Sequence, residues 1–102
     1  MSWTIFITNK ATKQIDKLSP NLKEIFEALL RDLQQCGPQL PGWPHFQKNH
    51  GTGKIECYHC HLQRGKPTWV AIWRVLDKRA RQLEIRYVGT HEKADYQRHC
   101  GV

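Results

Sequence analysis

Three stretches in the second half of the chain read KIECYHCHLQ at residues 54–63, TWVAIWRVLD at 68–77 and QLEIRYV at 82–88. Their β-branched and aromatic residues are typical of β-strands. The connections between them, residues 64–67 and 78–81, are short enough only for hairpins, so we expect three consecutive antiparallel strands. This antiparallel unit decides the fold class, because the rest of the chain has to pack against it.

The first residues predict a strand followed by a short helix. Residues 3–7, which read WTIFI, are all β-branched or aromatic, and this composition favours a strand. Thr8 or Asn9 then offers an N-cap for a helix over residues 10–18, whose apolar residues recur on one side.

A second, longer helix is the clearest element in the sequence. Ser19 as an N-cap and Pro20 at the first helical position are a strong start signal, and Gly37-Pro38 ends the helix. The spacing therefore predicts a helix over residues 20–36. Its apolar residues fall on one helical face: Leu22, Ile25, Phe26, Leu29, Leu30 and Leu33.

In chain order the predicted elements run β-α-α-β-β-β, with a Pro- and Gly-rich loop over residues 38–53 and a C-terminal helical turn over 91–98. This order predicts an α+β fold in which a helical hairpin packs on one face of an antiparallel sheet of about four strands. At 102 residues the chain can bury one core, so we expect a single domain over residues 1–102. The side chains expected in that core are Leu22, Ile25, Phe26, Leu29 and Leu33 from the helix, and Tyr58, Cys60, Val70, Ile72 and Ile85 from the sheet.

Positive charge is concentrated in the second part of the chain. The formal net charge is +7, and residues 38–102 carry eleven Lys and Arg side chains against five Asp and Glu. Such an excess indicates a surface that faces a polyanion or docks an acidic partner. A merely basic, solvated surface is the alternative interpretation.

The sequence has no apolar run of the roughly 18 residues that a membrane span needs. The N-terminus lacks the basic region and the small-residue cleavage site of a signal peptide, so we expect a cytoplasmic protein with no membrane contact. Proteins of that compartment rarely keep disulfides, and the four cysteines are therefore expected as free thiols: Cys36, Cys57, Cys60 and Cys100.

Two histidines on the strand over residues 54–63 are the first candidates for chemistry. Because side chains alternate between the two faces of a strand, Cys57, His59 and His61 share one face and Tyr58 and Cys60 the other. The two imidazoles would lie about 6.5–7 Å apart by the strand rise. Such a pair could flank one scissile phosphate, one as base and one as acid, because the pKa of histidine lies near neutrality. Two exposed histidines without a function are the alternative.

Other polar residues near this strand suit the same reaction. Metal-independent RNA cleavage needs a base for the 2′-hydroxyl, an acid for the 5′-oxygen and cations near the phosphorane, and it needs no cofactor. His50 and His91 are further candidates for proton transfer, from the preceding loop and from the end of the last strand. The candidates for phosphate contact are Lys54, Arg64, Lys66 and Arg86.

Two metal-binding alternatives arise from the same stretch. Cys57-Tyr-His-Cys60-His61 matches the C-x-x-C-H pattern of covalent haem, but that attachment needs export and a helical setting. Zinc held by Cys57 and Cys60 is disfavoured, because in a strand the two thiols point to opposite faces. Zinc held by His59, His61 and His91 stays open as an alternative, while the main interpretation requires no metal.

The order of the elements, the length and the ending Tyr87-Val-Gly-Thr-His-Glu-Lys-Ala-Asp-Tyr96 together resemble the RelE/ParE toxin superfamily of type II toxin-antitoxin systems. The resemblance covers the whole chain as topology and is specific over residues 54–96. Cys57-Tyr-His-Cys-His-Leu resembles the strand on which RelE-type mRNA interferases carry two active-site lysines at alternate positions, and His59 and His61 fall there.

The last strand adds to the resemblance. Gly89-Thr90-His91 resembles its end in the YafQ-like branch, where a catalytic histidine lies, and His50 and His61 resemble two further histidines of that branch. Tyr96 falls in the C-terminal segment where RelE-like toxins place a functional tyrosine, and Trp69 corresponds to a tryptophan of the middle strand. Both aromatic residues are therefore further candidates for RNA contact.

The sequence also departs from the family pattern at the positions that stabilise the phosphate. The middle-strand arginine of RelE-like toxins falls near Val70, and the acid before Trp69 is Thr68 here. The last-strand arginine of the YafQ branch falls at Tyr87, with Arg86 one step away on the opposite face. Stabilisation of the phosphate would then fall to other cations: Arg64, Lys66 or Lys54.

The resemblance implies a toxin that acts as a metal-independent, ribosome-dependent mRNA endoribonuclease and represses translation. It also implies two partners, mRNA on the ribosome and a small acidic antitoxin. Two alternatives stay open. One is a ParE-like toxin that inhibits DNA gyrase and has no RNase site, and the other is a catalytically silent RelE-like binding module.

Overall fold

The computed structural model describes residues 2–49 and 54–100, which we call the described residues. The predicted helix over 20–36 is confirmed at those bounds, and the other predicted elements are confirmed to within a few residues. In chain order the elements are β1 (Thr4–Ile7), α1 (Asn9–Asp16), α2 (Pro20–Cys36), β2 (Gln47–Lys48), β3 (Cys57–Gln63), β4 (Trp69–Asp77), β5 (Gln82–Thr90), the 3₁₀ helix η1 (His91–Lys93) and α3 (Tyr96–His99).

The strands form one mixed sheet in the order β1-β5-β4-β3-β2. The antiparallel pairing of β3, β4 and β5 confirms the predicted meander. β1 runs parallel to β5, so the expectation of a wholly antiparallel sheet is wrong at this edge. The reason is that the two helices, not a hairpin, connect β1 to the sheet, and a crossover of that length permits parallel pairing. The short strand β2, inside the predicted loop, pairs antiparallel with β3.

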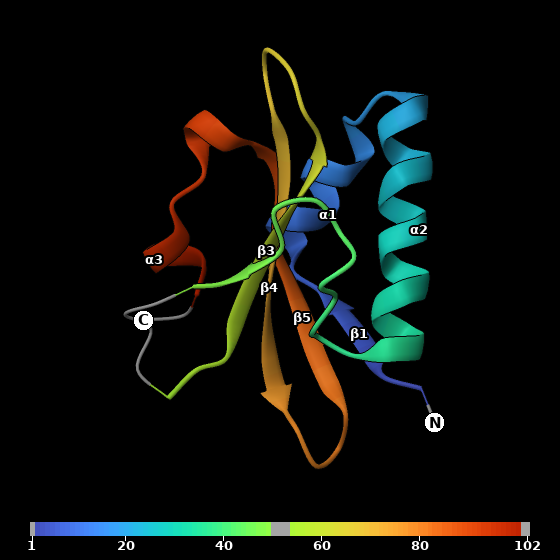
Figure 1. The fold of residues 1–102 in the computed structure, drawn as a ribbon, viewed down its shortest axis with the longest axis vertical. Helices are drawn as coiled ribbons and strands as arrows, with labels where there is room; N and C mark the ends of the chain where they lie inside the picture. Colours follow the sequence, from blue (N-terminus) through green and yellow to red (C-terminus); the bar gives the residue numbers. More distant parts are fainter. Residues whose placement is uncertain (1, 50–53, 101–102) are drawn as a thin grey trace.

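Helices cover both faces of this sheet to different extents. α1 and α2 lie on one face, and the short α3 lies on the other (Figure 1). The predicted caps are present, since the Thr8 hydroxyl accepts from the Ala11 N–H at 3.1 Å and the Ser19 hydroxyl accepts from the Leu22 N–H at 3.3 Å. The described residues contain no helix that is both long enough and apolar enough to cross a bilayer.

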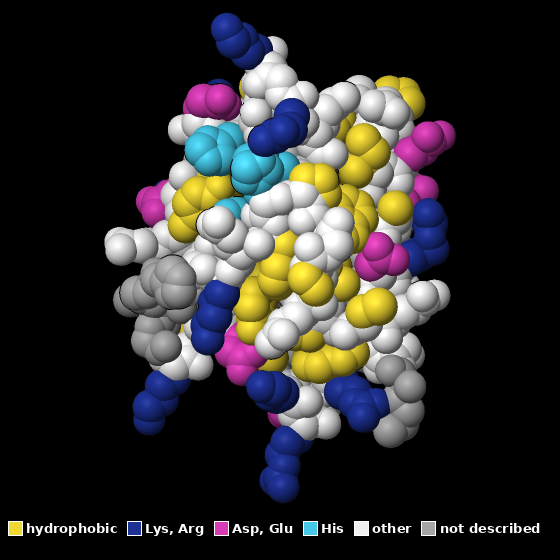
Figure 2. All heavy atoms as spheres, in the orientation of Figure 1, with side chains coloured by type: hydrophobic (Ala, Val, Ile, Leu, Met, Phe, Trp, Pro, Cys, Tyr) yellow, Lys and Arg dark blue, Asp and Glu magenta, His cyan; other side chains and the backbone are white. Residues whose placement is uncertain are grey.

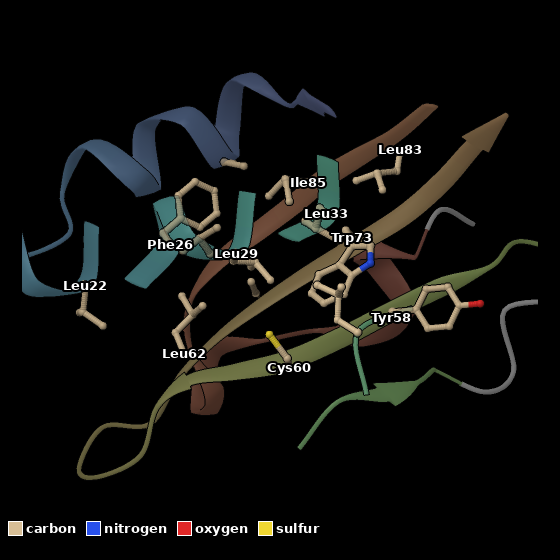
Figure 3. Packing of buried hydrophobic residues seen from close by; sticks show 14 of the residues in the cluster. Leu22, Phe26, Leu29, Leu33, Tyr58, Cys60, Leu62, Trp73, Leu83 and Ile85 are labelled. Atoms are coloured by element: carbon tan, nitrogen blue, oxygen red, sulfur yellow. The ribbon is translucent and has the colours of Figure 1, made fainter. Parts of the chain in front are cut away.

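The main core lies between helices α1 and α2 and the sheet (Figure 3). It confirms Tyr58, Cys60 and Ile85 as core residues, but Val70 and Ile72 lie on the opposite face, under α3. The alternation could not be read from the sequence because β4 is buried on both faces from Val70 to Trp73, so polar residues do not mark an outer face. The largest fully buried side chains of this core are Trp73, Phe26, Leu29, Leu33, Leu83 and Ile85.

A disulfide joins Cys57 of β3 to Cys100, directly after α3. The expectation that these two cysteines are free thiols is therefore wrong, whereas Cys36 and Cys60 are free. The physical reason is the fold: α3 returns over the sheet and brings the two Cα atoms to 5.6 Å, within the range that a disulfide spans. The disulfide fixes the C-terminal segment on the face of β3 that carries His59 and His61.

Candidate functional site

Four histidines, one tyrosine and one arginine gather on the sheet face opposite α1 and α2. This histidine cluster consists of His45, His59, His61, His91, Tyr96 and Arg64. Figure 2 shows histidine side chains side by side, with a basic side chain next to them. His59 and His61 both come from β3 and lie on the face that the alternation predicted, because their neighbours Tyr58 and Cys60 belong to the helix-side core.

His45 reaches the cluster from the loop between α2 and β2. The His61 backbone N–H donates to the Pro44 carbonyl at 2.8 Å, which holds this loop against β3. His45 has a φ of 51°, in the left-handed region that non-glycine residues rarely occupy. The resulting position stacks its ring on that of His61 with 4.3 Å between centroids. Backbone strain of this kind is concentrated at functional sites in folded proteins.

Arg64 supplies the positive charge of the cluster. It lies in the exposed turn after β3 and donates from a guanidinium nitrogen to Nε2 of His45 at 2.6 Å. Burial lowers the pKa of His61, and the neighbouring His45, His91 and Arg64 lower it further. A cation beside neutral imidazoles is an arrangement that attracts an anionic group such as a phosphate.

The C-terminal segment provides the remaining two rings. His91 begins η1 and its backbone N–H donates to the Thr68 carbonyl at 2.8 Å, which fixes it beside β4. Its ring meets that of His61 edge to face at 5.7 Å between centroids. Tyr96 of α3 lies 4.6 Å from the His59 ring and 6.2 Å from the His91 ring. Residues distant in sequence therefore converge around one point.

His59 is a neutral imidazole in the folded protein. Burial lowers its pKa to about 4, and the nearby His61, His91 and His45 add to this shift. The imidazole is therefore neutral at neutral pH, with one ring nitrogen that can accept. The side-chain oxygen of Asn49 lies against Nδ1 of the His59 ring.

Two buried polar atoms of the cluster have no hydrogen-bond partner among the described residues. They are Nδ1 of His61 and the hydroxyl of Tyr96. Because buried polar groups in folded proteins are nearly always paired, each of these two atoms offers a hydrogen-bonding position to a polar ligand or to water. Burial also raises the pKa of the Tyr96 hydroxyl, which therefore keeps its proton and can donate it in a hydrogen bond.

Zinc held by His59, His61 and His91 was the open alternative for this stretch, and covalent haem was a disfavoured one. Among residues 2–49 and 54–100, no group of three or more His, Cys, Asp or Glu side chains has a geometry that could hold a metal ion. Covalent haem would require the thiols of Cys57 and Cys60 together. Cys57 is bonded to Cys100, and Cys60 is fully buried in the helix-side core on the other face. The cluster is therefore best described as imidazoles, a phenol and a guanidinium.

Arg86 does not join the cluster. The pairing of β4 with β5 skips this residue, because Ile72 faces Tyr87 and Trp73 faces Ile85. The resulting β-bulge places Arg86 and Tyr87 in contact with the same residue of α3, so the expectation that they lie on opposite faces is wrong.

The guanidinium of Arg86 is occupied elsewhere. It donates to Oε1 of Glu84 at 3.1 Å and to the His99 carbonyl at 3.0 Å. It also lines a cavity of about 230 Å³ together with Thr8, Lys10, Arg98 and His99. With Arg86 paired to Glu84, Arg64 is the arginine of the described residues that contacts the histidine cluster.

The other predicted site residues divide between the cluster and the rest of the surface. Lys66 lies in the exposed turn after β3, two residues from Arg64, and Lys54 is exposed before β3. Trp69 packs against the helix-side core, away from the histidines. His50 lies outside the described residues. Val70, where the family has an arginine, is fully buried and brings no charge.

Sequence reasoning missed two residues of this site, His45 and Asn49. His45 lies in a Pro- and Gly-rich loop whose path no periodicity predicts, and only its place after Pro44, in a turn, could have drawn attention to it. Asn49 gives no signal at all in the sequence. Its role depends on burial and on contacts with residues from two other segments.

The lowered pKa of His59 predicts how the stability of the protein changes with pH. The unfolded chain has a histidine pKa of 6.5 and the folded chain one of about 4, so between these values the unfolded state binds more protons. The free energy of unfolding should therefore fall as the pH falls from about 6.5 towards about 4. His45, His61 and His91 face the same ring and act in the same direction. Denaturant unfolding at about pH 7 and about pH 5 should show a smaller loss for His59→Gln than for wild type, and equal losses would contradict the assignment.

Two helices pack on one face of a β-meander, and the N-terminal strand runs parallel to the last strand. This arrangement is the fold of the RelE toxins. A chain of the archaeal RelE–RelB complex from Pyrococcus horikoshii OT3 matches with a TM-score of 0.73 and 17% sequence identity, over 92% of this chain and 100% of that one. A double arginine-to-alanine variant of the E. coli toxin RelE in the free state matches with a TM-score of 0.72 and 18% identity, over 98% of this chain and 95% of that one.

Neither a protein-family model nor a curated protein matches the sequence. The two similar solved structures confirm the predicted α+β fold, and they confirm the resemblance to RelE at the level of the fold.

Proposed function

We propose that this protein is the toxin of a type II toxin-antitoxin system and cleaves mRNA on the ribosome without a metal ion. The observation that carries the proposal is the histidine cluster. It contains a neutral imidazole, a stacked imidazole pair, a buried hydroxyl that has no hydrogen-bond partner among the described residues, and an arginine, all on one sheet face. These are the groups that metal-independent phosphodiester cleavage requires. The RelE fold supports the same function.

The burial and contacts of the cluster suggest how the roles are divided. His59 acts as the general base for the 2′-hydroxyl, because its low pKa keeps the imidazole neutral. His91, which is exposed, protonates the leaving 5′-oxygen, and its ring is in contact with that of His61. Arg64 stabilises the charge on the phosphorane, with Lys66 in the same turn. The products would be a 2′,3′-cyclic phosphate and a 5′-hydroxyl.

The proposal includes partners and a compartment. The positive charge on residues 38–102 suits both an RNA backbone and an acidic protein. One of the similar structures is a complex of RelE with RelB. By analogy we propose a small acidic antitoxin that covers the basic surface of this protein, and we propose the cytoplasm, where mRNA is translated, as its location.

Cleavage of mRNA on programmed ribosomes, measured beside a DNA gyrase supercoiling assay, tests the proposed function. We expect cleavage by the wild-type protein that is unchanged by EDTA, with 2′,3′-cyclic phosphate ends, and no effect on supercoiling. Inhibition of gyrase without cleavage would instead support a ParE-like toxin, and neither activity would support a silent binding module. A Lys23→Ala variant is a suitable control, because Lys23 is exposed on α2, on the other side of the sheet.

A further inference from the structure

Asn49 lies between the disulfide and the histidine cluster. It follows β2, and its side chain is buried, with 7% of the residue exposed. Its backbone N–H donates to the Cys57 carbonyl at 2.8 Å. Its side-chain nitrogen donates to Sγ of Cys100 at 3.0 Å and to Sγ of Cys57 at 3.5 Å, while its side-chain oxygen lies against Nδ1 of His59. One amide therefore connects the disulfide to the proposed base.

The chemistry of these partners fixes which way the amide is turned. The sulfurs of a disulfide carry no hydrogen and can only accept, so the NH₂ group of Asn49 has to face them. The amide oxygen then faces the His59 ring. Because that oxygen can only accept, Nδ1 of His59 has to carry the proton. In a neutral imidazole the second nitrogen, Nε2, is then left with its lone pair.

We propose that Asn49, held in place by the Cys57–Cys100 disulfide, is a positioning residue that keeps His59 in the tautomer with the proton on Nδ1 and the accepting lone pair on Nε2. This inference rests on the proposed function, in which Nε2 of His59 takes the proton of the 2′-hydroxyl. Asn49 contacts neither RNA nor the reacting atoms, and it acts only through the ring that it orients. Partners that fix the tautomer of a catalytic histidine are common in enzymes.

The same contacts couple the tautomer to the redox state of the two cysteines. A dithiol that reduces the disulfide transfers two electrons and two protons to it, which breaks the S–S bond, forms two thiols and converts the dithiol into its own disulfide. A thiol can donate as well as accept, so the Asn49 oxygen can then face sulfur. With the amide turned over, its NH₂ group donates to Nδ1 and the proton of His59 moves to Nε2. Reduction therefore releases the constraint on the tautomer, and the reduced protein is expected to cleave more slowly than the oxidised one.

The direct test is NMR of ¹⁵N-histidine-labelled protein, in which couplings from the ring hydrogens show which nitrogen of His59 is protonated. Oxidised wild type should carry the proton on Nδ1, and protein treated with dithiothreitol should show Nε2–H or a mixture. The redox comparison needs no substitution, so it remains decisive if a variant folds poorly. A proton on Nε2 in the oxidised protein, or the same tautomer in both redox states, would overturn the proposal.

Substitutions separate the amide oxygen from the bulk of the side chain. Asn49→Leu has nearly the same shape but no acceptor, and it should lose the Nδ1–H preference and lower kcat by about 10–100-fold with KM unchanged. Asn49→Asp keeps an oxygen that accepts from Nδ1–H and should keep the tautomer. Asn21→Leu, on an exposed position of α2, is the matched control and should change neither.

The two readouts distinguish this inference from the proposed function. If the tautomer responds as described but no RNA is cleaved, the positioning role stands and the RNase proposal fails. If RNA is cleaved and Asn49→Leu leaves both the tautomer and kcat unchanged, the RNase proposal stands and the positioning role is wrong.

Discussion

Replacing His61 with alanine is expected to lower the rate of RNA cleavage by about 10²–10⁴-fold, as much as removing a positioned proton donor or acceptor, because the His61 ring supports that of the proposed acid, His91. His61 lies at the centre of the cluster, because its ring stacks on His45 and meets the edge of His91. The substitution removes the imidazole whose buried Nδ1 has no partner within residues 2–49 and 54–100, and it takes away the support of both neighbouring rings. The loss should appear in the rate constant of the cleavage step, measured under single-turnover conditions on programmed ribosomes.

A matched control for this variant is available on the same strand. Gln63 ends β3 and is exposed, so Gln63→Ala should leave the cleavage rate within about twofold of wild type, like most surface substitutions. Thermal unfolding of both variants would show whether the fold is retained. A His61→Ala protein that is folded and cleaves RNA at the wild-type rate would show that this histidine takes no part in the reaction.

The largest expected effect on stability belongs to Trp73. Its side chain is fully buried under the helices (Figure 3), and its indole N–H donates to the Pro38 carbonyl at 3.0 Å. Truncation to alanine leaves a large cavity and an unpaired carbonyl, so the free energy of unfolding should fall by about 3–5 kcal/mol. Urea unfolding measures this change directly.

Phe6→Ala is the control for Trp73→Ala, because Phe6 is also aromatic and lies in a strand but is 44% exposed. It should cost about 1 kcal/mol or less. If the two variants were equally stable, the core would not lie between the helices and the sheet as described.

The sequence was sufficient for the elements whose signals are local. The helix over residues 20–36 was predicted at its observed bounds, because Ser19, Pro20 and Gly37 specify both ends and the apolar face needs no tertiary information. The direction of β1, and which residues of β4 point to which face of the sheet, could not be predicted in this way. Both depend on what packs beside them: β5 for the first, and α3 over Val70 and Ile72 for the second.

The candidate site was predicted in part for the same reason. His59 and His61 share a face because strands alternate, and this follows from the sequence alone. The position of His45 beside His61 depends on the path of a loop. The bulge at Arg86 depends on how β4 pairs with β5, and the Cys57–Cys100 disulfide depends on the path of the C-terminal segment. Composition contains no information about those paths, so charge alone wrongly grouped Arg86 with the histidines.

Comparison of the wild-type protein with a His61→Ala/His91→Ala double variant in ribosome-programmed mRNA cleavage tests the central claim most directly. Both substitutions leave α1, α2 and the main core untouched, since neither residue belongs to that core. We expect the wild type to cleave in the presence of EDTA and the folded double variant to leave the mRNA intact. Cleavage by the double variant at the wild-type rate would contradict the claim that the histidine cluster is the site of the reaction.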